Sequence, residues 1–424
     1  MDEMTSEVVI MNKKGMSLAA DSAITSGRDG IQKVYNSANK LFSLSGSHPV
    51  GMMIYGAASF MEVPWDIIIK SYREHLGVKK FADLTGYAEG LLQFLNDDVR
   101  FKNKEIESII VDRTYSDILK NIVKEVEEKM EQHPEEDNMD DKIQVWLMER
   151  TEASLKAMKE MEKCFLDIDY ASFKEAFLPL IKEITAELVS SPISPALKEK
   201  LCELAFEAVR KDFFSAGSSG VVICGYGEEE IFPHLLNYRL EGFVFGQLKY
   251  KKLKERKISY TPDKKDGTAS ITAFGQTEMV DSFMHGIEPT MADAMFEIIH
   301  KVFMNYHEQL KKHTGIELTD EQVTSMKNLG KEVYTSIHEA VDEYQQQNYI
   351  YPLLGVVRSL PIEELAEMTE ALVNLTSFKR RVTRATESVG PPVDVAVISK
   401  GDGFVWVKRK NYIDPKINYQ WKGG

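Results

Sequence analysis

The chain has 424 residues, of which 43% are hydrophobic and 28% charged, so it is long and apolar enough to form a large folded core. Its 66 acidic against 52 basic residues give a net charge of −14, which argues against general binding to nucleic-acid phosphates. The three cysteines lie far apart without CxxC spacing, which favours reduced thiols over a disulfide framework.

The distribution of apolar residues bears on localisation. Residues 1–15 lack an apolar segment after a basic start, so we expect no secretory signal peptide. The most apolar window, residues 49–69, is interrupted by Glu62 and Asp66 and therefore does not predict a membrane span. We expect a cytoplasmic protein that binds neither membranes nor nucleic acid.

The first part of the chain has strand-like patterns, and helical patterns follow. "EVVIM" and "MSLAADS" flank a turn at residues 12–15, and "KLFSL" and "VGMMIYG" flank another at 45–49, which predicts two β-hairpins. From about residue 57 to 214, apolar residues recur at spacings of three and four, which predicts helices. Within this region, Ser194 followed by Pro195 is typical of an N-cap and first helical turn.

Strand patterns return in the second half of the chain. Apolar runs alternate with glycine-rich turns over residues 220–275. The basic run "KYKKLKERK" (249–257) within them predicts a solvated edge strand, because lysines protect such edges from aggregation. Residues 278–350 again have helical spacing, and "PVDVAVIS" with "GFVWVKRK" predicts a final hairpin over the turn "KGDG".

The order of these elements predicts an α+β fold. Strands at both ends and in the middle, with helices between them, favour two stacked sheets covered by helices, a four-layer αββα sandwich. We expect a single domain over residues 1–424 with two helical insertions, at about 100–215 and 288–355. A separate helical domain near 100–215 is the alternative.

Several common site motifs are missing from the sequence. It contains no GxxxxGK[ST] phosphate-binding loop, no GxSxG motif and no Cys/His protease signature. His307 and His313 are six residues apart, which places them roughly 240° apart around a helix, so they cannot share one metal ion. We therefore expect no cofactor and no metal.

Thr5 stands out as a candidate nucleophile. A threonine hydroxyl needs a base, and the α-amine of an N-terminal threonine, with an unperturbed pKa of about 7.7–8.0, can serve as one. A nearby lysine paired with a carboxylate would tune that amine, and Thr5, Asp21 and Lys40 can meet if their three strands lie side by side in one sheet. Asp21 lies between apolar "LAA" and "SAI", so it needs a partner if buried, and Lys40 would supply one. A strand threonine chosen for β-propensity is the alternative.

The segment "TSEVVIMNKKGMSLAADSAITSG" resembles the N-terminus of proteasome β-subunits and of HslV-type bacterial peptidases, which are N-terminal nucleophile (Ntn) hydrolases. These proteins begin at their catalytic threonine and run through a strand, a glycine turn and an "AxDSRAT.G"-like strand. The match is gapless, so the resemblance implies Thr5 as the nucleophile and Asp21 as the family's aspartate. "NKLFSL" resembles the strand that supplies the lysine, which favours Lys40, with Lys33 in "QKVY" as the alternative.

Further segments resemble the family in the same order, over roughly half of the chain. "MIYGAASF" resembles a strand-to-helix junction whose glycine amide is the oxyanion donor, which implies Gly56. "GVVICGYGEEE", "ITAFGQTEMVDSF" and the final hairpin resemble later strands and a later junction.

The sequence also departs from the family pattern. Gln276 or Thr277 stands where the family has the serine of "GSG", and Ala23 replaces the arginine of "DSRAT". The "RDAxSGG" motif, which supports the active site, becomes "RRVTRATESVGPPVD", with Thr386 and Ser388 nearby but no aspartate in register. Thr5, Asp21 and the lysine are therefore retained, whereas the family's supporting residues are not retained at these positions.

The resemblance implies a threonine peptidase that hydrolyses peptide bonds after Met4–Thr5 is cleaved and residues 1–4 are removed. It also implies a homo-oligomeric ring, peptide or protein substrates and a separate ATPase unfoldase as a partner. Two alternatives remain. One is a non-catalytic scaffold resembling proteasome α-subunits, which keep an N-terminal extension, and the other is a small-molecule amidase whose insertions shape a pocket.

Overall fold

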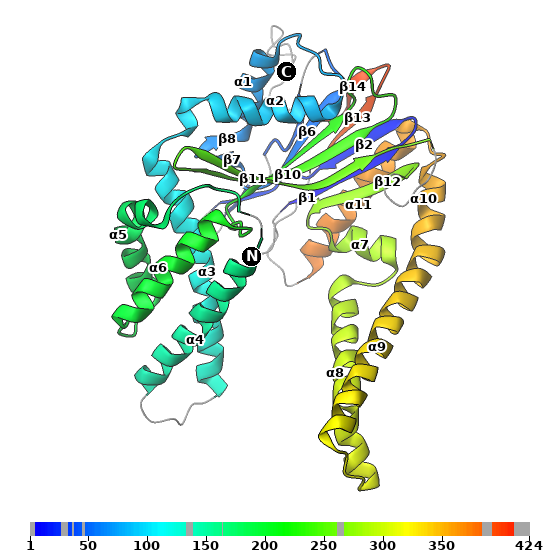
Figure 1. Cartoon of the computed structure of the whole chain (residues 1–424). Coiled ribbons are helices and arrows are strands. Elements are labelled where there is room, and N and C mark those ends of the chain that lie inside the picture. Colours follow the sequence, from blue (N-terminus) through cyan, green and yellow to red (C-terminus); the bar gives the residue numbers. More distant parts are fainter. Residues whose placement is uncertain are drawn as a thin grey trace. The chain divides into compact units, whose positions relative to one another are not determined.

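The computed structural model describes residues 5–26, 33–35, 38–44, 47–132, 139–162, 164–260, 267–383 and 392–410. The chain divides into two compact units. Unit 1 consists mainly of Asn39–Arg256, and unit 2 consists of Met4–Ala38 together with Lys257–Gly423. Each unit contains a five-stranded sheet with helices, so the architecture is α+β (Figure 1).

The sheet of unit 2 is built around the N-terminal strand. Its strands, in spatial order, are β12 (Ala269–Gly275), β1 (Ser6–Asn12), β2 (Gly15–Ala20), β13 (Asp394–Ser399) and β14 (Gly403–Lys408). β1 and β2 form the predicted hairpin over residues 12–15, and β13 and β14 form the predicted final hairpin, so both predictions are confirmed. A separate two-stranded sheet pairs β3 (Ile24–Ser26) with β4 (Lys33–Tyr35).

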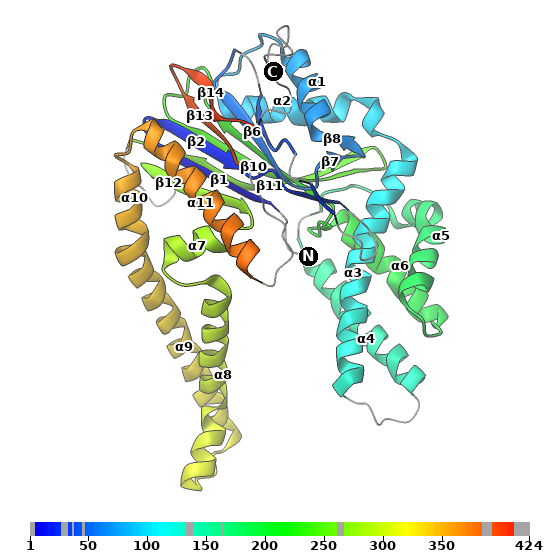
Figure 2. The same ribbon diagram turned by 180° about the vertical axis from the view of Figure 1, so that it is seen from behind.

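Helix α11 (Ile362–Val382) covers one face of this sheet (Figure 2). The buried apolar side chains between them include Val8, Ile10, Ala19, Leu365, Leu372 and Val373. Asn12, at the end of β1, donates from Nδ2 to the carbonyl oxygens of Val357 and Leu360, both at 2.9 Å. The end of β1 is thereby fixed to the turn that leads into α11.

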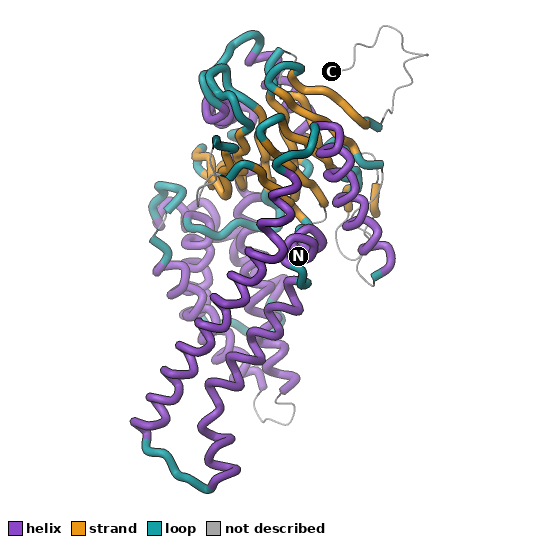
Figure 3. Tube along the Cα trace, turned by 90° about the vertical axis from the view of Figure 1, so that its right-hand side faces the viewer, coloured by secondary structure: helices purple, strands orange, loops and turns teal. Residues whose placement is uncertain are grey.

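The remaining helices of unit 2 form a long hairpin and its supports. They are α7 (Glu278–His285), α8 (Pro289–Thr314), α9 (Asp320–Gln345), a π-helical turn (Gln346–Ile350) and α10 (Tyr351–Val357). α8 and α9 pack against each other and are joined by a short loop (Figure 3). Every residue of α8 is described and none is buried, whereas α9 buries Gly330. This hairpin lies within the range predicted for the second helical insertion.

The sheet of unit 1 has the spatial order β11 (Gln247–Lys257), β10 (His234–Val244), β9 (Ser219–Gly225), β6 (Val50–Gly56) and β5 (Leu41–Ser43). β5 and β6 form the second predicted hairpin. β11 is an edge strand of this described sheet, as the lysine-rich run predicts. Lys249 differs from that prediction because it is buried, and its Nζ donates to the carbonyl oxygens of Ala208 (3.1 Å) and Phe213 (2.6 Å).

Unit 1 also contains most of the helices. They are α1 (Trp65–Leu76), α2 (Leu84–Asp97), a 3-10 turn (Val99–Phe101), α3 (Lys104–Gln132), α4 (Met139–Glu160), α5 (Tyr170–Leu188) and α6 (Pro195–Arg210). Helices α3 to α6 lie within the range predicted for the first insertion. The predicted N-cap is confirmed, because Ser194 Oγ accepts from the Leu197 amide at 3.3 Å. Among the described helices, none is long and apolar enough to cross a membrane.

The segment after β6 differs from the sequence prediction of a helix from about residue 57. Instead, β7 (Ser59–Phe60) and β8 (Val63–Pro64) form a small hairpin before α1. Met61 and Glu62 at its turn have φ angles of 48° and 60°, a conformation that costs free energy for non-glycine residues. Tertiary contacts stabilise it, since Glu62 accepts from Arg113 at 2.8 Å and Met61 Sδ accepts from a backbone amide.

Candidate functional site

Thr5 lies at an end of the unit 2 sheet where four strands begin or finish. It directly precedes β1, whose Ser6 is opposite Gly275 at the end of β12. On the other side, Ala20 at the end of β2 is opposite Asp394 at the start of β13. Because the strands are antiparallel, residues that are distant in sequence meet at this one end.

Asp21 holds the peptide bond that follows Thr5. Its Oδ1 accepts from the Ser6 amide at 3.0 Å, and its own amide donates to the Ser6 carbonyl at 3.2 Å. Its Oδ2 accepts from the Ala23 amide at 2.9 Å, and the side chain is fully buried. The carboxylate therefore has a fixed orientation next to the candidate nucleophile.

Thr5 itself is closely confined. It is 4% exposed, and its carbonyl oxygen accepts from the Gln276 amide at 2.6 Å. A Cβ atom added to Gly275, which has a φ of +69°, would lie 2.2 Å from Thr5 O and 2.5 Å from Thr5 Oγ1. Only glycine permits this approach. Among the described residues, the buried Oγ1 has no hydrogen-bond partner.

A buried hydroxyl without a partner costs free energy and calls for an explanation. A hydroxyl that reacts with a substrate carbonyl is one such explanation. The geometry around Thr5 fits it, because both groups of the peptide bond that follows Thr5 are held by hydrogen bonds, while the hydroxyl has no partner among the described residues.

The other two predicted site residues lie in unit 1, at a common end of β5 and β6. Lys40 is 4% exposed, and its carbonyl oxygen accepts from the Ile54 amide at 2.9 Å. Gly56 ends β6 with a φ of +75°, and an added Cβ would lie 2.7 Å from Ser218 O. The structure thus groups Thr5 with Asp21 in unit 2 and Lys40 with Gly56 in unit 1. The prediction that the strands of Thr5, Asp21 and Lys40 share one sheet is wrong, because β5, which follows Lys40, pairs with β6 in the other five-stranded sheet.

Further residues named from the sequence have different places. Lys33, the alternative lysine, lies in β4 opposite Ser26. Thr277 is the N-cap residue of α7, and its side chain makes no capping hydrogen bond. Met4, Thr386 and Ser388 lie outside the described residues, so the cleavage site and the altered support motif are not described.

The sequence analysis missed a cluster that includes Ser22, the residue after Asp21. Ser22 and Asp394, which are buried, form a hydrogen-bonded cluster with the partly buried Lys410. One signal for it was present, since Asp394 interrupts the apolar run "VDVAV" as Asp21 interrupts its own strand. A carboxylate in such a run needs a partner when it is buried.

Unit 1 contains a different buried ionisable pair, away from Lys40 and Gly56 in the sequence. Burial raises the pKa of Glu241, which accepts from the Ser215 amide at 2.9 Å. Burial also lowers the pKa of Lys249 to about 8, although the nearby Glu241 carboxylate opposes this shift. Both groups bind backbone or hydroxyl atoms of the last turn of α6 and of the segment after it, so their evident role is to anchor this part of the chain.

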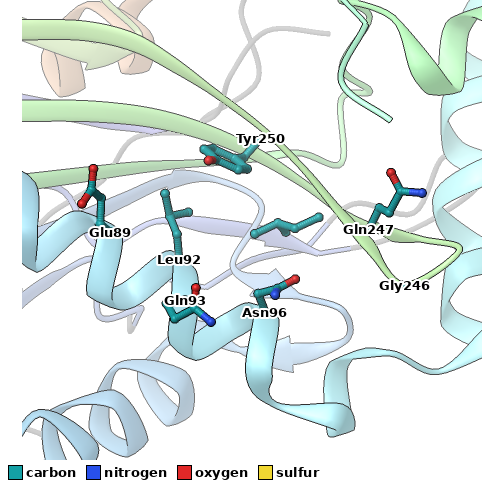
Figure 4. Close-up of a pocket in the computed structure, with 8 residues that line it drawn as sticks. Glu89, Leu92, Gln93, Asn96, Gly246, Gln247 and Tyr250 are labelled. Carbon is teal, nitrogen blue, oxygen red and sulfur yellow. The ribbon is translucent and has the colours of Figure 1, made fainter. Parts of the chain in front are cut away.

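A groove of about 560 Å³ runs between α2 and the start of β11 (Figure 4). Its lining includes Glu89, Gln93 and Asn96 from α2, with Tyr250 on the opposite side. Gln93 already donates to Asp97 at 2.7 Å. None of the predicted site residues lines this groove, and it offers no nucleophile, so it is a weaker candidate site than the surroundings of Thr5.

Within the described part of the chain, no group of three or more His, Cys, Asp or Glu side chains could hold a metal ion. Comparison with known proteins yields neither a matching family model nor a matching curated sequence.

Proposed function

We propose that this chain is a proteasome-like threonine peptidase of the Ntn-hydrolase type. The observation that carries the proposal is the buried Thr5 hydroxyl, which has no partner among the described residues, in a residue whose following peptide bond is held by the Asp21 carboxylate. The gapless resemblance of residues 5–27 to proteasome β-subunits supports the same function.

In the proposed reaction, Thr5 Oγ first attacks the Met4 carbonyl carbon, and the Met4–Thr5 C–N bond breaks as the Thr5 nitrogen takes up the hydroxyl proton. Water then hydrolyses the resulting ester, which releases residues 1–4 and frees the Thr5 hydroxyl beside its new amine. That amine then takes the hydroxyl proton while Oγ attacks the carbonyl of a substrate peptide bond. The amine half of the substrate leaves, and water hydrolyses the ester that remains on Thr5. No cofactor or metal takes part in this scheme.

Two residues of unit 1 complete the proposed site. Lys40, with Asp21 as its counter-ion, would tune the amine electrostatically. The Gly56 amide would donate to the oxyanion, a role whose loss typically slows a reaction by about 10²–10³-fold. Both roles require that the two units bring their strand ends together.

We also infer that the two sheets form the inner layers of a four-layer αββα sandwich. Val8 and Ile10 pack in the core with α11, yet Val9 and Met11 on the alternate face of β1 are also fully buried. A strand with apolar residues on both faces is typical of a sheet covered on both sides. The sequence resemblance to proteasome β-subunits and HslV-type peptidases implies a homo-oligomeric ring that acts with a separate ATPase unfoldase, and we propose the same for this chain with peptide or protein substrates.

The scaffold alternative is favoured by one observation. α8 exposes a stripe of apolar side chains at helical spacing, consisting of Met291, Met295, Ile298, Val302 and Tyr306. Exposed apolar stripes are typical of contact surfaces. A scaffold would keep residues 1–4, so the state of the N-terminus separates the two functions.

The test is the intact mass of the purified wild-type chain and of two variants, Thr5→Ala and Thr5→Ser. We expect the wild-type chain to lose residues 1–4, Thr5→Ala to keep them, and Thr5→Ser, which retains a hydroxyl, to lose them more slowly. If all three chains keep residues 1–4, the peptidase function is wrong and the scaffold function replaces it.

A second measurement separates a peptidase from an amidase. A chain that begins directly at Thr5, released from an N-terminal fusion, is assayed with fluorogenic peptides and with small amides. Turnover of peptides that disappears in the matching Thr5→Ala chain supports the proposal, whereas turnover of small amides alone would favour the amidase.

A further inference from the structure

The cluster beside Asp21 consists of three residues from two distant parts of the chain. Lys410 Nζ donates to Ser22 Oγ at 2.8 Å and also forms an ion pair with Asp394 Oδ2. Asp394 Oδ1 accepts from the Lys410 amide at 2.8 Å, and Ser22 Oγ donates to the Pro392 carbonyl at 2.5 Å. Asp394 and Ser22 are 2% and 0% exposed.

This pair is a poor means of stabilising the fold alone. Removing two charges from water carries a large desolvation penalty, which their attraction often fails to exceed. Apolar side chains of similar size would frequently fold as well. A buried ion pair that is nevertheless present calls for another role, and its contacts indicate what it holds.

The contacts of Ser22 connect the ion pair to the candidate site. Ser22 follows Asp21 directly, and its carbonyl oxygen accepts from the Ala38 amide at 3.1 Å. Its hydroxyl is held by Lys410 and by the Pro392 carbonyl. The segment 21–23 is therefore fixed on the side of β13, while the Asp21 carboxylate itself holds the amides of Ser6 and Ala23.

We propose that Asp394 and Lys410 are positioning residues, which act through Ser22 to orient the Asp21 carboxylate beside Thr5. The pair holds the backbone that carries Asp21, and Asp21 holds the peptide bond that follows Thr5. The effect of this pair on the reaction of Thr5 rests on the proposed function. The orientation of Asp21 can be measured independently of it.

Two variants test the pair without leaving an uncompensated charge. Ser22→Ala removes the link to Asp21 and keeps the ion pair, whereas the double variant Asp394→Leu with Lys410→Met removes both charges together. The matched control is Lys408→Met, which removes the exposed ion pair between Lys408, at the end of β14, and Glu370 of α11. Exposed pairs of this kind contribute little to stability.

The primary measurement is hydrogen exchange of the Ser6 and Ala23 amides, both of which donate to Asp21. We expect both test variants to exchange these amides at least tenfold faster than wild type, with urea midpoints close to wild type. Lys408→Met should leave both amides unchanged. Unchanged exchange rates of these amides in the two test variants would overturn the proposal. The proposal would also fail if Lys408→Met raised the exchange rates equally, or if an equal loss of global stability explained the faster exchange.

The secondary measurement is the rate at which residues 1–4 are removed, followed by intact mass. We expect the two test variants to process at least tenfold more slowly than wild type. Equal processing rates in the wild type and the variants, despite faster exchange, would overturn the catalytic side of the inference. A wild-type chain that never processes, with faster exchange in the variants, would support the positioning of Asp21 and contradict the proposed function instead.

Discussion

Replacing Gly275 by alanine tests whether Thr5 is confined as closely as the structure indicates. An added Cβ would lie 2.2 Å from Thr5 O, whereas real Cβ atoms essentially never approach another atom within 3.0 Å. Thr5 must therefore retreat by about 0.8 Å, and its hydrogen bond to the Gln276 amide must shift with it. The alanine would also have to keep the left-handed φ of +69°.

The two costs can be separated. Keeping a left-handed φ costs about 1–2 kcal/mol, and overpacking costs typically about 1–3 kcal/mol more. We expect Gly275→Ala to lower the free energy of unfolding by about 2–5 kcal/mol. The control is Gly315→Ala, at the end of α8, where φ is +70° and no atom lies within 4 Å of the added Cβ. It should show the backbone cost alone.

Urea denaturation followed by circular dichroism measures both losses, and intact mass measures the removal of residues 1–4. Because a misplacement of about 1 Å can slow a reaction by about 10²-fold, we expect Gly275→Ala to process about 10–100-fold more slowly. Gly315→Ala should process at the wild-type rate. Equal losses of stability in the two variants would refute the close approach of Gly275 to Thr5, whatever the processing rates are.

Two further predictions concern stability. Asn12→Ala should lower the free energy of unfolding by about 2–3 kcal/mol, because the carbonyls of Val357 and Leu360 lose their hydrogen-bond donor. Urea denaturation measures this loss, and a loss below about 0.5 kcal/mol would contradict the two hydrogen bonds. Burial lowers the folded-state pKa of Lys249 to about 8 from its ordinary 10.5, so the unfolded state binds more protons between these pH values and stability rises with pH there. Relative to Lys249→Met, the wild type should gain roughly 2–3 kcal/mol from pH 8 to 10.5, and parallel stability curves would refute the shift.

The hairpins of the fold could be predicted from the sequence because their signals are local. The short turn between Asn12 and Gly15 sets the register of the first hairpin, which pairs Glu7 with Ala20. That register alone brings Asp21 to the residue after Thr5. The resemblance to Ntn hydrolases lies in the same segment, so residues 5–27 are enough to predict Thr5 as the candidate nucleophile and Asp21 as its carboxylate.

Tertiary structure decided the features that depend on distant segments. The β7–β8 hairpin was not predicted from the sequence, because contacts with Arg113 and with the β10 backbone stabilise a turn conformation that the residues of the turn themselves disfavour. Lys249 belongs to a lysine-rich run that predicts a solvated edge strand. Its side chain is nevertheless buried, and its ammonium group donates to the carbonyl oxygens of Ala208 and Phe213, near the end of the range predicted for the first insertion.

The same reason applies to the candidate site. The sequence by itself determined that Thr5 and Asp21 are neighbours, since a two-residue turn fixes their strands against each other. Only the tertiary structure placed Asp394 and Lys410 beside Ser22, because β13 pairs with β2 across more than 370 residues of chain. No local pattern encodes such a pairing, which depends on how the whole of unit 2 packs.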